Sequence, residues 1–257
     1  MKFLITDTWT LTPETFIFFT TCCQIKSDKG QSLTHPPVNL DDPILTAFFD
    51  RLQCIFAVMD GQYAEAAKHY GFRCEGCEDN CCRTRFNHHT YLEYLYIHAG
   101  LNKLGPQRQR EIQSKAAVVC REIAKAGEKA MSVRLMCPLN SDGRCTLYRH
   151  RPMICRLHGI SHELRKPGQN VIRGPGCGMF DLRCSDMSYL KFDRTPFYFE
   201  MAKLENELKQ AVGLSGRVKM TIAEMIIAGR QRSEGRECGS RNEDWGMGKY
   251  SFSDFEF

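Results

Sequence analysis

The chain has 257 residues, of which 42% are hydrophobic, so it is long enough to form one large domain or two small ones around an apolar core. Its mean hydropathy is −0.39, and it contains no apolar run of about 18 residues, which argues against a membrane-spanning helix. The net charge is +5 and there are 14 cysteines, a combination that allows either a nucleic-acid-binding protein or a metal–thiolate protein.

Residues 1–40 precede the first clear structural pattern. The stretch 1–23 contains apolar residues, but Asp7 and Glu14 interrupt them and no small-residue cleavage site follows, so it does not resemble a secretory signal peptide. Residues 26–39 are rich in Ser, Gly, Pro and polar residues, which is typical of a linker. We therefore expect a disordered leader over 1–40 and a cytoplasmic protein.

Helical patterns begin at Asp41, Asp42 and Pro43, where an Asp N-cap precedes Pro at the first helical position. Apolar residues then recur at the spacing of an amphipathic helix, and the helix is expected to restart after Gly61 and to run to Tyr70. The same reasoning predicts further helices over 90–99 (ended by Gly100), 106–130, 195–212 and 217–229.

The stretch 132–184 has many Gly and Pro residues and little periodicity. A loop region of this length is unusual in a compact domain unless something such as a metal organises it. We expect a mainly α-helical single domain over 41–229, in which helices surround irregular cysteine-rich metal-binding loops, with short β-strands allowed beside the cysteines. The cysteine-cluster core would cover about 70–185, and a flexible tail would follow over 230–257.

The first cysteine group, CEGCEDNCC, comprises Cys74, Cys77, Cys81 and Cys82. A C-x2-C step lets two thiolates converge on one ion across a tight turn. Neighbouring side chains diverge on a strand and lie about 100° apart on a helix, so Cys81 and Cys82 are not expected to bind one tetrahedral ion together. Either they serve two metals or a multi-iron cluster, or one is a ligand while the other packs. A strained vicinal disulfide is the third alternative.

The second group comprises Cys137, Cys145 and Cys155. The Asn-Ser-Asp-Gly sequence at 140–143 is a turn signal, which would return the chain so that Cys145 meets Cys137 as in a hairpin. Pro152 then fixes the approach of the chain to Cys155. Together the two groups supply seven thiols.

Further cysteines and the histidines lie outside these two groups. Cys177 and Cys184, in and after a Gly-rich segment, could complete a second four-ligand site, whereas Cys54 and Cys120 fit core positions of helices. His158 follows Cys155 at acceptable ligand spacing and is the first histidine to test as a replacement for a thiolate. For each histidine taken alone, His88, His89, His150 and His162 included, a surface or hydrogen-bonding role is favoured.

Arginines concentrate beside the cysteines. Their simplest role is to offset thiolate charge and to donate hydrogen bonds to sulfur. A nucleic-acid surface would instead show interleaved aromatic residues or a basic stripe on one helix, so we expect a protein or small-molecule partner and neither nucleic acid nor a membrane. The arginines concerned are Arg73, Arg83, Arg85, Arg144, Arg149, Arg151 and Arg156.

The two segments together, C-x2-C-x3-CC over 74–82 and CP-x-N-x-DG-x-C-x2-Y-x2-RP-x2-CR over 137–156, resemble the YkgJ-type cysteine-cluster family. Its members are described as zinc- or iron-chelating proteins and are often labelled iron–sulfur oxidoreductases, and flagellin lysine N-methylases carry a related pattern. The resemblance covers about residues 70–160. This chain has Glu78, Asp79 and Asn80 before the cysteine pair where family members usually have two residues, a departure that bears on the geometry of the first segment and not on the ligand set.

Two hypotheses for function follow. The first is a metal-cluster protein that holds zinc or an iron–sulfur cluster through the two cysteine segments and has a redox or protein-modifying role. The alternative is a non-catalytic binding module in which zinc supplies folding energy to the loops. Four thiolates suit either metal, so the sequence does not separate zinc from iron. It contains no G-x-S-x-G, phosphate-binding loop or complete dinucleotide fingerprint, and it identifies no catalytic residue.

Overall fold

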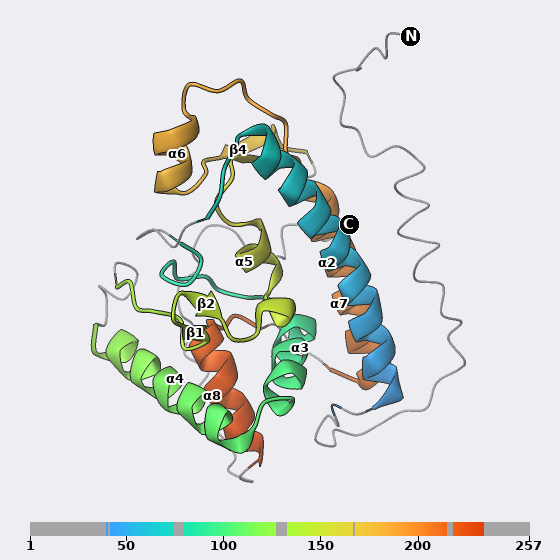
Figure 1. The fold of residues 1–257 in the computed structure, drawn as a ribbon. Helices are drawn as coiled ribbons and strands as arrows, with labels where there is room; N and C mark the ends of the chain where they lie inside the picture. Colours follow the sequence, from blue (N-terminus) through green and yellow to red (C-terminus); the bar gives the residue numbers. More distant parts are fainter. Residues whose placement is uncertain are drawn as a thin grey trace.

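The computed structural model is mainly helical, with two short antiparallel hairpins, as the sequence predicts (Figure 1). None of the described helices is both long enough and apolar enough to cross a membrane. Residues 1–39 of the expected leader, residues 234–257 of the expected tail and Cys77 lie outside the described residues, whereas the first four residues expected in the tail belong to a helix that ends at Ser233. The structure describes residue 40 and residues 42–74, 80–126, 133–166, 168–214 and 218–233.

In the described part of the chain, five long helices frame a region of short elements. The long helices are α2 (Pro43–His69), α3 (Tyr91–Asn102), α4 (Pro106–Ala126), α7 (Thr195–Val212) and α8 (Ile222–Ser233). Between α4 and α7 lie β1 (Asn140–Ser141), β2 (Arg144–Cys145), the 3₁₀ turn η2 (Tyr148–His150), α5 (Met153–Leu157), β3 (His162–Leu164), β4 (Ile172–Gly174) and α6 (Gly178–Cys184).

Helix α2 begins as expected, because the Asp42 side chain accepts a hydrogen bond of 2.8 Å from the amide of Ile44 and Pro43 takes the first helical position. The helix runs through Gly61 without the predicted interruption. A single helical glycine costs only about 1 kcal/mol, and the apolar face of α2 continues on both sides of it, with Met59 and Ala66 buried. This face packs against α7 and α5.

Helix α3 also continues past the glycine that was expected to end it, and reaches Asn102. A Cβ atom on Gly100 would lie 2.7 Å from Cγ of His150, so the missing side chain lets η2 pack directly on α3. The carboxylate of Glu205 on α7 accepts hydrogen bonds from the amides of Tyr91 and Leu92 at the start of α3. Helix α3 is therefore fixed at both ends, between α7 and the loop that carries the second cysteine group.

Helices α4 and α8 pack against each other on the side of the molecule opposite α2 (Figure 1). Helix α8 begins at Ile222, later than the sequence predicts, because Thr221 and Glu224 form a capping box: Thr221 Oγ1 accepts from the amide of Glu224, and the Glu224 carboxylate accepts from the amide and hydroxyl of Thr221. A two-way backbone bridge joins Met220 to His88, so the start of α8 lies beside the loop that follows the first cysteine group.

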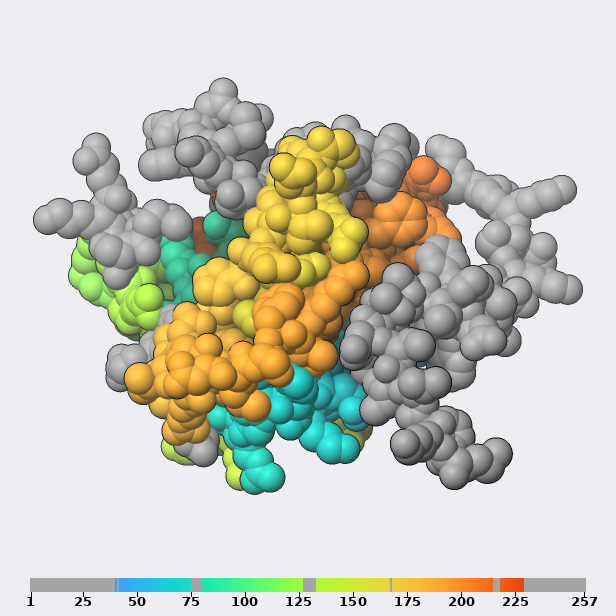
Figure 2. Space-filling view, turned by 90° about the horizontal axis from the view of Figure 1, so that it is seen from above, coloured from blue at the N-terminus to red at the C-terminus, as the bar shows by residue number. Residues whose placement is uncertain are grey.

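The other end of the molecule is covered by β3, β4 and α6. Figure 2 shows their yellow and orange surface next to cyan surface from the end of α2. Phe180 of α6 makes edge contacts with Tyr70 and Phe72, at centroid distances of 4.8 Å and 5.3 Å, and the amide of Leu190 donates to the Tyr70 hydroxyl. These contacts attach the Gly-rich segment to the end of α2.

Candidate metal–thiolate site

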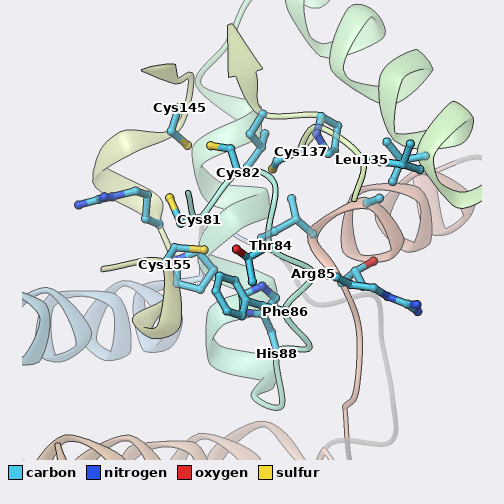
Figure 3. A pocket seen from close by; sticks show the side chains of 18 of the residues that line it. Cys81, Cys82, Thr84, Arg85, Phe86, His88, Leu135, Cys137, Cys145 and Cys155 are labelled. Carbon is cyan, nitrogen blue, oxygen red and sulfur yellow. The ribbon is translucent and has the colours of Figure 1, made fainter. Parts of the chain in front are cut away.

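Cysteines from both sequence groups line one cavity. It lies between the loop after the first group, helix α4, the loop before β1 and the first turn of α8, and its volume is about 70 Å³, which is room for several water molecules. Figure 3 shows the cysteine side chains at one end of this cavity, with their sulfur atoms turned toward the space between them. The lining cysteines are Cys81, Cys82, Cys137, Cys145 and Cys155.

Asn80 shapes the turn that carries Cys81 and Cys82. Its side-chain oxygen accepts from the amide of Cys82 at 2.8 Å, and its backbone carbonyl accepts from the amides of Arg83 and Thr84. The carbonyl of Cys82 in turn accepts from the amide of Cys137 at 2.7 Å. The two cysteine segments are thus joined by a direct backbone hydrogen bond.

The hairpin predicted from the Asn-Ser-Asp-Gly sequence is present. Asp142 and Gly143 both have positive φ angles, 53° and 80°, which is the conformation of a two-residue type I′ turn. Asn140 pairs with Cys145 across the hairpin. The turn therefore brings Cys145 back beside Cys137, and the two thiols interact electrostatically.

Cys155 lies on the short helix α5, which buried polar groups hold in place. The Glu93 carboxylate caps this helix by accepting a hydrogen bond of 2.7 Å from the amide of Met153, and burial raises the pKa of Glu93. The guanidinium of Arg156 donates to the carbonyls of Arg149 and Arg151 and forms an ion pair with Asp60 on α2. Arg156 thus fixes the Arg-Pro segment that leads to Cys155.

The thiols of the cavity influence one another's protonation. Cys81 donates a hydrogen bond to the sulfur of Cys82, which raises the pKa of Cys81 and lowers that of Cys82. Burial raises the pKa of Cys137 to about 12 and that of Cys155 well above its usual value, with the Cys137 and Cys145 thiols adding to the shift. Without a cation, most of these thiols are therefore neutral at pH 7.

A second set of thiols interacts electrostatically with the hydroxyl of Tyr63. Burial raises the pKa of Tyr63, and the thiols of Cys74, Cys177 and Cys81 raise it further. Cys177 is buried at the N-cap of α6, and its amide donates to the carbonyl of Gly159. Neither Cys74 nor Cys177 lines the cavity. Cys81 also interacts with Cys155 in the cavity, so its thiol contacts both sets electrostatically, whereas the thiol of Cys82 interacts with those of Cys137 and Cys145.

The remaining candidates are placed as follows. Cys184 is buried and donates from Sγ to the carbonyl of Tyr70 at 3.7 Å, so its thiol faces α2. Cys120 on α4 is half-buried against the core and does not line the cavity. The ring of His158 makes an edge contact with Phe86. His88, in contrast, lines the cavity and is only 3% exposed.

The sequence reasoning missed the apolar wall of the cavity. This wall comes from α4 and from the first turn of α8, elements that are distant in sequence from both cysteine groups and carry no motif. The bridge between His88 and Met220 brings α8 there, and single-residue bridges leave no pattern in a sequence.

Within the part of the chain that the structure describes, no three or more Cys, His, Asp or Glu side chains are arranged as a group that could hold a metal ion. The chemistry of the donors nevertheless fits a soft or borderline metal, since the described lining of the cavity includes several thiols and no carboxylate. Comparison of the chain with protein-family models, with curated proteins and with solved structures finds no match.

Proposed function

We propose that this chain is a metal–thiolate protein with a redox or group-transfer role. One observation carries the proposal: five cysteines, from segments more than fifty residues apart, line one cavity. Burying several neutral thiols together gives little stabilisation by itself, whereas a thiophilic cation would bind them as thiolates and release their protons.

The interactions between individual thiols favour two separate metal centres. Cys82, Cys137, Cys145 and Cys155 would form the one at the cavity, because their thiols interact with one another. The other would use Cys81 with Cys74 and Cys177, whose thiols all interact electrostatically with Tyr63, and Cys77, which follows Cys74 at C-x2-C spacing; Cys81 also interacts with Cys155 and would lie where the two centres adjoin. Adjacent cysteines are not expected to bind one tetrahedral ion together, and in this division Cys81 and Cys82 each bind a different centre.

Iron–sulfur centres would supply electron transfer, and zinc would supply Lewis acidity or stability. The chain itself contributes positive charge at the cavity. Arg151 lines it and lowers the pKa of Cys82 as one of several causes, so this guanidinium favours thiolates there. The resemblance to the YkgJ-type family agrees with an oxidoreductase or protein-modifying enzyme, and a set of reduced thiols fits the cytoplasm.

The cavity favours a reactive centre over a purely structural one. Structural zinc sites are closed by four protein ligands, whereas catalytic sites keep access for water or substrate. Here the thiols of Cys82, Cys137, Cys145 and Cys155 line one end of a hollow space.

The alternative, a zinc-stabilised binding module, is favoured by one observation. Between α4 and α7 the described chain contains only short elements, the longest being the seven-residue α6. Such a region has few backbone hydrogen bonds of its own, and a structural metal would supply the missing stability.

Anaerobic purification followed by metal analysis and absorption spectroscopy tests the proposal. A brown protein that contains iron and loses absorption in the visible region on reduction would support the redox role. A colourless protein with stoichiometric zinc would support the binding module. Protein that folds without bound metal and does not take up zinc or iron would overturn the proposal.

A further inference from the structure

The lining of the cavity beside the cysteines combines apolar walls with a few polar and charged groups. Its walls are mostly apolar, with Val119 and Ile123 from α4 and Leu135 from the loop before β1. Among the described residues, its charged side chains are Arg85 and Arg151, and no described Asp or Glu lines it. A mainly apolar hollow with a few polar groups is the usual form of a small-molecule site.

One end of the cavity holds polar groups that suit an anion. Ile222 and Ala223 are the first two residues of α8 and line the cavity. The capping box uses the amides of Thr221 and Glu224, which leaves the amides of Ile222 and Ala223 without an acceptor inside the helix. The Glu224 carboxylate already lies at this helix end through its bonds to Thr221, so the helix dipole alone does not identify a ligand.

His88 supplies the second, independent observation. Its ring belongs to the same wall as Thr84 and Phe86 (Figure 3), and its Nε2 is buried without a hydrogen-bond partner. A buried nitrogen without a hydrogen-bond partner is unfavourable, because it has lost its hydrogen bonds to water and gained none in the protein. Burial also lowers the pKa of His88 to about 3, so the ring is neutral and can donate from one nitrogen. Its backbone is hydrogen-bonded to Met220, one residue before the cap of α8.

We propose that this cavity binds a small organic carboxylate, with the carboxylate at His88 and the first turn of α8 and the apolar part against α4, pointing toward the thiols. The positive charge of Arg85 favours an anion, and the described lining contains no acidic side chain that would favour a cation. The inference goes beyond the proposed function, since it depends on the walls of the cavity and not on what the thiols bind.

Butyrate serves as the probe, with 1-butanol and butylamine as neutral and cationic counterparts of similar size, and ligand-observed NMR gives the affinities. Val119→Phe fills the cavity, and Val118→Phe is its matched control, because Val118 is 47% exposed on the same helix. His88→Phe removes the polar contact at nearly constant volume. Metal content and thermal unfolding are measured for every variant as purified.

We expect saturable butyrate binding in the wild type and in Val118→Phe, its loss in Val119→Phe, and affinity weaker by roughly tenfold both for His88→Phe and for 1-butanol. Three outcomes would overturn the inference. The two valine variants could bind butyrate equally, all three probes could bind the wild type equally, or the folded wild type could show no saturable binding. Absent binding in protein with full metal content refutes the cavity inference alone, and butyrate binding in protein that takes up no metal refutes the proposed function alone.

Discussion

The amide of Cys137 donates a hydrogen bond of 2.7 Å to the carbonyl of Cys82. This single contact joins two cysteine segments that are far apart in sequence, and it sets the distance between their thiols through the backbone. Because the hydrogen bond joins two main-chain groups, it does not involve the thiol side chain of either cysteine. The site is therefore organised by the fold, with Asn80 and the 140–145 hairpin shaping its two sides.

Removing a thiol at the cavity should remove metal. For Cys155→Ser we expect loss of the metal bound at the cavity and a lower yield of soluble protein, because a hydroxyl is a poor ligand for zinc or iron beside thiolates. Cys120→Ser is the matched control on α4, where the thiol packs against the core. Metal analysis of both proteins decides, and full metal content in Cys155→Ser would contradict the proposed ligand set.

The two buried cysteines of α6 offer a sharper comparison. Cys177 and Cys184 lie at opposite ends of this helix and are 4% and 5% exposed, so serine at either position should cost a similar stability, about 1–3 kcal/mol. Of the two, only the thiol of Cys177 is among those that interact electrostatically with Tyr63, as the thiol of Cys74 does. We expect Cys177→Ser to lose the second centre and to keep the first, while Cys184→Ser retains both. Equal metal content in the two variants would exclude Cys177 as a ligand.

The sequence predicted local features well and long-range ones poorly. The start of α2 at Pro43 and the hairpin at Asp142 and Gly143 depend on residues next to one another, and both are confirmed. The helices that pass through Gly61 and Gly100 were expected to break there. Tertiary packing decides such cases, and for Gly100 the contact comes from His150, fifty residues later in the chain.

The same distinction applies to the site. Of the nine cysteines that the sequence predicted as metal ligands, five line one cavity, while Cys74, Cys177 and Cys184 do not and Cys77 lies outside the described residues. The apolar wall from Val119 and Ile222 could not be predicted, because nothing in α4 or α8 marks them as neighbours of cysteines. That wall places the thiols at the side of a cavity.

The two helical glycines allow a test of packing against helix propensity. Gly61→Ala adds a Cβ that meets no atom within 4 Å, so we expect stabilisation by up to about 1 kcal/mol. Gly100→Ala places its Cβ 2.7 Å from the His150 ring, and we expect destabilisation by about 1–3 kcal/mol from overpacking. Chemical denaturation of both variants measures the difference. Similar changes in the two free energies of unfolding would show that η2 does not pack on α3 as described.

Acid should destabilise the protein partly through His162. Burial, with the charge of Arg194 adding to it, lowers the pKa of this side chain to about 4 from an ordinary value of 6.5. The unfolded chain therefore binds the proton more readily than the folded one, so stability falls as the pH drops from about 6.5 to about 4, and it is insensitive to this group above 6.5. The ring also packs on Gly174, where a Cβ would lie 2.3 Å from it, so the charge cannot easily move to solvent.

His162→Gln removes this titration, and we expect a shallower loss of stability between pH 6.5 and 4 than in the wild type, measured by chemical denaturation at several pH values. His69→Gln is the control, because His69 is exposed. Any metal lost in acid is common to the three proteins, so the difference in slope isolates His162. Parallel pH profiles for the His162→Gln and His69→Gln variants would mean that the folded protein accommodates a protonated His162 without cost.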